Sequence, residues 1–151
     1  MKLTLMLCLL TLSATALAAG KAHEHGKAKL DVGVEATKIT LQLETPLDNL
    51  LGFERAPRNE AERKRVDAAV ARLRDAGALF RIDPAAGCKP GAVELVSPAL
   101  KLGPPAQGDA GHADLDGSFE FVCTDAAKAA YIDVGLFEFQ RLQQLTVQVA
   151  T

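Results

Sequence analysis

The feature that most constrains the fold is a strict alternation of apolar and polar residues in two neighbouring segments. In "KAKLDVGVE", residues 27–35, every second side chain is apolar or small, and "KITLQLE", residues 38–44, repeats the pattern after a short turn. A period of two places successive side chains on opposite faces of an extended strand. The two segments therefore predict a β-hairpin with one buried and one solvated face.

The remaining segments predict one helix and further strands. Residues 45–59 contain Pro and Gly and suggest a structured loop, after which apolar residues recur at helical spacing from about residue 60 to residue 79. Asn59 and Glu62 resemble a capping box at the start of this helix. Further strands are expected within four segments, which cover residues 92–97, 113–123, 131–139 and 143–150.

The chain shows a weak internal sequence similarity. A histidine precedes the alternating segment "AKLDVGVE", and another precedes the alternating segment "ADLDGSFEF". Short alternating strands also resemble each other by chance, so duplication is one of two explanations. We expect an α+β fold in which antiparallel β-sheet is built from two hairpin-like halves, with one amphipathic helix and one disulfide.

The N-terminal residues have the pattern of a secretory signal. Lys2 precedes a short apolar run, and residues 16–18 offer an A-x-A cleavage sequence. The run is too short to span a bilayer. We predict a signal peptide over residues 1–18 and a single soluble periplasmic domain over residues 19–151, with cleavage after Ala19 or Gly20 as alternatives.

Cysteine usage agrees with export. Cys8 leaves with the signal, so Cys88 and Cys123 remain. In an oxidising compartment an even pair is most simply explained as one disulfide. That bond would leave no thiolate for catalysis or for zinc.

Charge and motifs limit the function classes. The formal charge is −2 and becomes −3 when Lys2 leaves with the signal, so no overall charge attracts nucleic acid or an anionic membrane. The sequence has no nucleophile elbow, HExxH motif, phosphate loop or dinucleotide fingerprint. We expect a protein that is not an enzyme, does not bind nucleic acid and does not insert into the membrane after signal cleavage.

The three histidines each precede an alternating segment. If the strands extend back through them, His23, His25 and His112 all fall on polar faces. Zinc sites use three or four ligands from His, Cys, Asp and Glu. We predict a metal site at His23 and His25, completed by His112 and Asp114 if the two strands lie side by side.

Other interpretations of the histidines stay open. Asp116 could replace Asp114 as the carboxylate ligand, and the HEHG motif could be merely a solvated terminus. Cleavage after Gly20 would instead leave His23 third from the N-terminus, where amine, amides and imidazole form a copper or nickel site.

The predicted helix region carries a local excess of positive charge. Its basic residues are Arg55, Arg58, Arg63, Lys64, Arg65, Arg72, Arg74 and Arg81. A solvated helix face is the plain interpretation. The alternative function is a non-metal interaction module of the cell envelope, which docks an acidic partner through Arg72 and Arg74.

Five segments resemble, in order and spacing, the exported proteobacterial family of unknown function that includes the periplasmic zinc-binding protein ZrgA. They are "HEHGKAKLDVGVE", "LQLETPLDNLLGFERAP", "AAGC", "GHADLDGSFEFVC" and "IDVGLFEFQRLQQLTVQV". The resemblance covers nearly the whole mature chain. It implies a Zn²⁺-binding protein that supports zinc acquisition or storage, as a carrier to an uptake transporter of the envelope, with His23, His25 and His112 at the family's histidine positions.

Two departures from the family pattern limit what is carried over. Members typically have a histidine where this chain has Arg55. The His-rich insert of many members is represented here by "LGPPAQGDAG", which contains no histidine. We therefore expect one zinc site and not a high zinc capacity.

Overall fold

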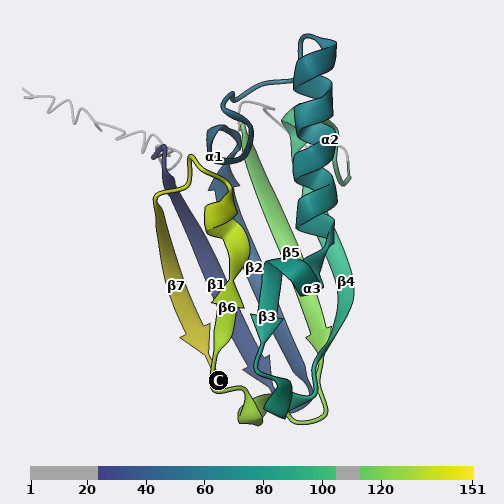
Figure 1. Ribbon diagram of the computed structural model, residues 1–151, viewed down its shortest axis with the longest axis vertical. Coiled ribbons are helices and arrows are strands. Elements are labelled where there is room, and N and C mark those ends of the chain that lie inside the picture. Colours follow the sequence, from purple (N-terminus) through teal and green to yellow (C-terminus); the bar gives the residue numbers. More distant parts are fainter. Residues whose placement is uncertain (1–23, 105–112) are drawn as a thin grey trace, which may run out of the picture.

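The predicted hairpin forms the middle of a five-stranded sheet in the computed structural model, which describes residues 24–104 and 113–151 (Figure 1). Strand β1 (Lys27–Glu35) pairs antiparallel with β2 (Lys38–Pro46). The other side of β2 pairs with β5 (Asp114–Val122), which pairs in turn with β4 (Lys89–Val96). Strand β7 (Gln144–Ala150) runs parallel to β1 and completes the order β4-β5-β2-β1-β7.

A layer of helices and a small second sheet lies against one face of this sheet (Figure 1). Helix α1 (Leu47–Leu51) follows β2 directly, and α2 (Glu60–Arg74) runs roughly along the strand direction near β4 and β5. The short helix α3 (Ala76–Leu79) leads into β3 (Phe80–Ile82), which pairs antiparallel with β6 (Ile132–Val134). Four 3₁₀ turns complete the described elements, at Pro84–Ala86 (η1), Pro98–Leu100 (η2), Ala126–Lys128 (η3) and Gly135–Glu138 (η4).

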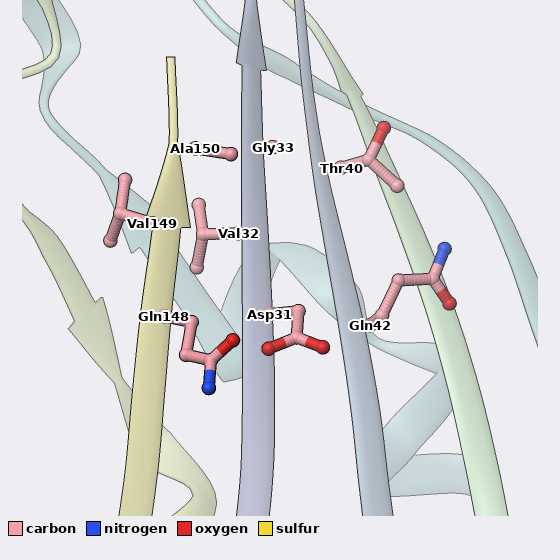
Figure 2. A pocket seen from close by; sticks show the side chains of 8 residues that line it. All are labelled: Asp31, Val32, Gly33, Thr40, Gln42, Gln148, Val149 and Ala150. Atoms are coloured by element: carbon pink, nitrogen blue, oxygen red, sulfur yellow. The ribbon is translucent and has the colours of Figure 1, made fainter.

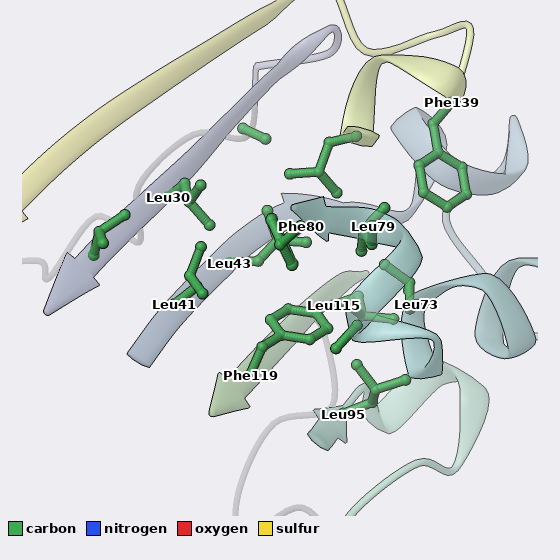
Figure 3. Packing of buried hydrophobic residues seen from close by; sticks show 14 of the residues in the cluster. Leu30, Leu41, Leu43, Leu73, Leu79, Phe80, Leu95, Leu115, Phe119 and Phe139 are labelled. Atoms are coloured by element: carbon green, nitrogen blue, oxygen red, sulfur yellow. The ribbon is translucent and has the colours of Figure 1, made fainter. Parts of the chain in front are cut away.

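The core lies between the sheet and the covering layer (Figure 3). The strands contribute the predicted alternate residues, among them Leu30, Ile39, Leu41, Leu43, Leu115 and Phe119. The covering layer contributes Leu73, Leu79, Phe80, Leu136 and Phe139. The rings of Phe80 and Phe119 meet edge to face with their centroids 4.9 Å apart. The chain has no Trp, so the aromatic part of the core consists of Phe residues, and this pair is packed among mainly aliphatic side chains.

The long helix ends earlier than the sequence predicts. The capping of its start by Asn59 is confirmed, because the Asn59 side chain accepts a hydrogen bond from the Glu62 amide. The predicted extension to Leu79 is wrong, because Asp75 leaves helical geometry and its carboxylate accepts from the Ala78 amide. An Asp side chain that caps a new helix competes with continuation of the old one.

The second half of the chain differs from a repeat of the first. Strand β5 pairs with β2 and β4, whereas β6 pairs with β3 in the covering layer. The predicted loop over residues 45–59 also contains the short helix α1. The α+β class is confirmed, but the second hairpin-like half does not form a β5–β6 pair.

The predicted disulfide between Cys88 and Cys123 is present. It joins the residue before β4 to the residue after β5, so it closes the end of an antiparallel strand pair. No helix in the described part of the chain is both long and apolar enough to span a membrane. The predicted signal peptide, residues 1–18, lies outside the described residues.

Removal of the disulfide by Cys88→Ala/Cys123→Ala should lower the free energy of unfolding by about 4 kcal/mol, because the bond closes a loop between positions 35 residues apart. Urea unfolding measures the change. Reduction of the unaltered protein is the matched control and should give a similar loss. Equal stability with and without reductant would contradict the prediction.

Candidate metal-binding site

The two strands that follow histidines in the sequence, β1 and β5, begin at the same end of the sheet. Strands β1 and β5 are both antiparallel to β2, so both begin where β2 ends and α1 starts. Strand β2 lies between them, which separates β1 from β5 by about 10 Å. The predicted site required β1 and β5 to lie side by side, and they do not. His23 and His112 lie outside the described residues, so the full predicted ligand set stays a prediction.

His25 lies in a turn that precedes β1. The amide of Lys27 donates to the carbonyl of Glu24 at 3.1 Å, and Gly26 has a φ of 81°. Residues with a side chain rarely adopt this left-handed conformation, whereas glycine adopts it freely. The strand consequently begins at Lys27 and does not extend back through the HEHG motif as the parity argument assumed. The turn determines where the His25 side chain lies.

The buried side chain of Asn49 holds this turn in place. Its Oδ1 accepts from the Gly26 amide at 2.7 Å, and its Nδ2 donates to the Lys27 carbonyl at 2.8 Å. The same Nδ2 lies 3.1 Å from Oγ1 of Thr45. Asn49 is 1% exposed, so it ties α1, the end of β2 and the start of β1 together inside the protein.

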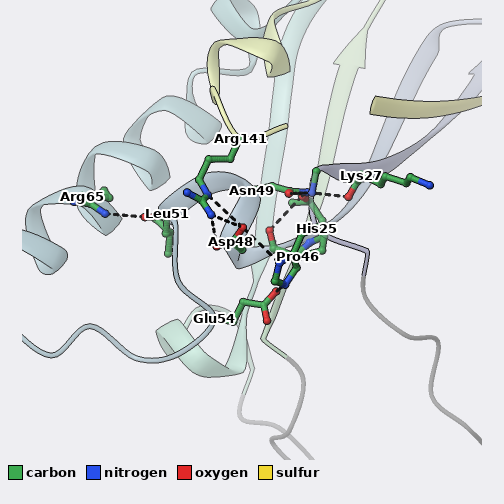
Figure 4. Close-up of polar contacts among 11 residues, drawn as sticks. His25, Lys27, Pro46, Asp48, Asn49, Leu51, Glu54, Arg65 and Arg141 are labelled. Carbon is green, nitrogen blue, oxygen red and sulfur yellow. Dashed lines mark hydrogen bonds and ion pairs between the residues drawn. The ribbon is translucent and has the colours of Figure 1, made fainter. Parts of the chain in front are cut away.

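The imidazole of His25 lies between two carboxylates (Figure 4). Its Nε2 is 3.0 Å from Oε1 of Glu54, which comes from the loop after α1. Its Nδ1 faces Oδ2 of Asp48 at 3.9 Å, an ion-pair distance that is too long for a hydrogen bond. The His25 side chain is 61% exposed and that of Glu54 is 32% exposed, so solvent reaches both members of the pair.

Arg141 neutralises the buried carboxylate of this cluster (Figure 4). Its Nη2 donates to both oxygens of Asp48 at 3.1 and 3.0 Å, and its Nε donates to Oδ2 at 3.2 Å. Asp48 lies in the first turn of α1 and is 8% exposed, so an unpaired charge there would be costly. The guanidinium therefore fixes Asp48 and brings a positive charge close to His25.

Asp114 lies on the other side of β2. It faces Pro46 in the register, and the carbonyl of its neighbour Ala113 accepts from the Leu47 amide at 2.8 Å. Burial, followed by the charges of Asp114 and Glu44, raises the pKa of Asp116 above its usual range. The described residues contain no group of three or more His, Cys, Asp or Glu side chains arranged to hold a metal ion.

The basic residues of the helix region are largely engaged within the protein. Arg72 pairs with Glu138 of η4, and Arg65 donates to the Leu51 carbonyl at 2.9 Å. Arg55 makes two hydrogen bonds with Glu62, at 2.7 and 2.9 Å. The Arg55 guanidinium holds the pKa of Glu62 at about 2. The partner-binding role predicted for Arg72 and Arg74 stays a prediction.

Sequence reasoning missed three of the residues that surround His25. Glu54 is next to Arg55 in sequence, but it faces His25, and Arg55 faces Glu62. Asp48 and Arg141 are 93 residues apart in sequence, and no local pattern links them. The available signal was the position of "LDN" directly after β2, because the neighbouring strand β1 begins beside that end of β2.

The fold and this cluster define a small α+β domain with a histidine–carboxylate pair at one end of its sheet. Residues 22–151 match the family described as "ZrgA family zinc uptake protein", and the chain belongs to this family. The membership gives the protein a zinc-related role. No protein of the curated collections matches the chain.

Substitution of Asn49 by Ala should destabilise the protein by roughly 2 to 4 kcal/mol. It leaves the buried amide of Gly26 without its acceptor, and each such unsatisfied group costs about 1 to 3 kcal/mol. Urea unfolding and amide exchange at Gly26 measure the effect. Gln42→Ala, which removes an exposed hydrogen bond to Ser118, is the control and should change stability by less than about 0.5 kcal/mol. Equal losses in both variants would contradict the anchoring role.

Proposed function

We propose that the protein binds one Zn²⁺ ion as cargo between Nε2 of His25 and the carboxylate of Glu54, and carries or stores it in the periplasm for an uptake transporter of the envelope. The observation that carries this proposal is the 3.0 Å separation of His25 Nε2 and Glu54 Oε1. Membership of the zinc uptake family supports zinc as the ion.

The separation of these two atoms suits a shared zinc ion. Zinc binds imidazole nitrogen and carboxylate oxygen at about 2.0 to 2.2 Å in tetrahedral geometry, which places two ligand atoms roughly 3.4 Å apart. Nε2 and Oε1 would need to separate by only a few tenths of an ångström. The partly exposed side chain of Glu54 can accommodate a movement of that size.

Asp48 suits a supporting role and not direct ligation. Histidines that bind zinc through one nitrogen commonly direct the other toward a carboxylate, which fixes the orientation of the ring. Asp48 faces Nδ1 of His25 at 3.9 Å, so it would have to move closer to accept such a hydrogen bond, and its own carboxylate is held by Arg141. With that approach, the order Asp48, His25, zinc and Glu54 would match the usual arrangement of such sites.

The remaining ligands have to come from residues near this end of the sheet or from water. In the sequence, His23 directly precedes Glu24, which is part of the turn. His112 directly precedes Ala113, whose carbonyl accepts a hydrogen bond from the first residue of α1. Both are therefore candidates to complete the site. Asp114 is a further candidate, although Glu54 is the carboxylate that contacts His25.

Calorimetric titration of zinc into the purified mature protein tests the site directly. Glu54→Gln keeps the shape of the side chain but removes the anionic ligand, so it should weaken binding at least roughly tenfold, which is the smallest loss typical even of a residue that only supports a ligand. Glu24→Gln is the matched control, because Glu24 lies in the same motif but pairs with Lys27. Unchanged affinity in Glu54→Gln or in His23→Ala/His25→Ala would overturn the proposed site.

Removal of Arg141 should have the opposite effect on zinc. Arg141→Gln removes a positive charge near His25 and frees the Asp48 carboxylate to attract the ion, so zinc should bind roughly 3- to 10-fold more tightly. The gain should shrink at high salt. Arg81→Gln, which breaks an exposed pair with Asp133 elsewhere, should leave the affinity unchanged. Weaker binding in Arg141→Gln would show that orientation of Asp48 matters more than charge.

A further inference from the structure

Strand β7 forms one edge of the main sheet, and among the described residues no strand pairs with its outer side. The backbone groups along such an edge can pair with another strand, so proteins usually protect edges with charges, prolines or bulges. The two edges of this sheet differ sharply in that protection.

The opposite edge strand, β4, carries several of these features. It contains Lys89, Pro90 and Glu94, and its pairing with β5 is irregular between Pro90 and Val93. In contrast, β7 has the sequence QLTVQVA, with no charge and no proline. Residues 142–151 contain no charged side chain in a chain that is 24% charged. The edge formed by β7 is therefore open to pairing, and that of β4 is not.

The side chains of β7 show a second unprotected feature. Val147 and Val149 are 48% and 64% exposed, although they lie beside Leu30 and Val32 on the inner, apolar face of the sheet. With Tyr131 they line an apolar groove of about 330 Å³ between the sheet and the segment around β6. On the outer face, Gln148 borders a shallow, open hollow beside Asp31, Thr40 and Gln42 (Figure 2).

We propose that β7 pairs antiparallel with β7 of a second copy of this chain, which gives a two-fold symmetric dimer with a continuous ten-stranded sheet. The register that pairs all seven residues is centred on Val147. It places Leu145 opposite Val149 on the inner face and Thr146 opposite Gln148 on the outer face. Every apolar residue then faces an apolar residue, and every polar or small residue faces an uncharged one.

This self-complementarity identifies the second copy as the occupant. A two-fold interface requires one surface that complements itself, and a neutral strand with matched faces meets that requirement. A charged strand would find no opposite charge along β7. Each copy uses the unprotected β7 edge of its main sheet in the pair, and the protected β4 edges then end the ten-stranded sheet on both sides, as far as the described residues go. The assembly stops at two chains and does not depend on zinc.

Sedimentation equilibrium of the purified mature protein, over a hundredfold range of concentration, tests the dimer. The mass should rise from that of one chain to that of two. Val147→Lys places two ammonium groups opposite each other on the symmetry axis and should weaken the dimer at least tenfold. Ala92→Lys, at an exposed position of β4, is the matched control and should leave it unchanged. Circular dichroism checks that both variants fold.

Cysteine crosslinking tests the register independently of charge. In the proposed pair the two Val147 side chains lie directly opposite, about 4.5 to 5.5 Å apart at Cβ, which allows a disulfide after a small adjustment. Val147→Cys should therefore form a covalent dimer on mild oxidation. Ala150→Cys should not, because its two copies lie roughly 20 Å apart. A monomer at every concentration, a dimer lost in Ala92→Lys, or a monomer that captures a peptide of another protein along β7 would each overturn the proposal.

Discussion

The antiparallel pairing of β2 with both β1 and β5 determines where the candidate ligands of this protein lie. Because both neighbours run opposite to β2, the segments that precede them reach the same end of the sheet. Helix α1 begins at that end, directly after β2, and brings Asp48 and Asn49 to the same place. A site that draws on residues from distant parts of the sequence thus follows from one strand and its two neighbours.

The turn around His25 shows how a buried polar group can organise an exposed one. Asn49 satisfies both backbone groups of the turn that it contacts, and Gly26 allows the backbone to adopt the required conformation. The His25 side chain itself is 61% exposed. Its position therefore depends on a hydrogen-bond network that lies beneath it, in the same way that metal-binding histidines depend on residues that do not touch the metal.

The strands were the most predictable part of the molecule, since alternation reports burial on one face directly. The hairpin of β1 and β2, the inner face of β5 and the Cys88–Cys123 bond were all predicted. The end of α2 was not, because Asp75 can either continue a helix or cap the next one, and the covering layer decides. The partners of β5 and β6 depend on the order of strands, which periodicity does not encode.

Sequence patterns could select His25 as a candidate ligand, but they could not identify the residues that surround it. His25 could be selected because its motif is unusual in a chain with three histidines. Glu54 could not, because its sequence neighbour Arg55 offered an obvious partner that the structure assigns to Glu62. The pairing of Arg55 with Glu62 also affects the candidate site. Arg55 binds Glu62 in a bidentate pair and stacks on Phe53, so the loop is fixed while Glu54 stays available to His25.

The balance of charges around His25 suits an ion that is carried and released. Glu54 supplies one negative charge at the open side of the imidazole, whereas Arg141 cancels that of Asp48 on the buried side. A structural zinc site would instead be closed by four protein ligands and would contribute to folding. Here the disulfide closes the β4–β5 pair, and an apolar core holds the sheet and its covering layer together. The proposed site would therefore gain or lose its ion without loss of the fold, as the proposed carrier role requires.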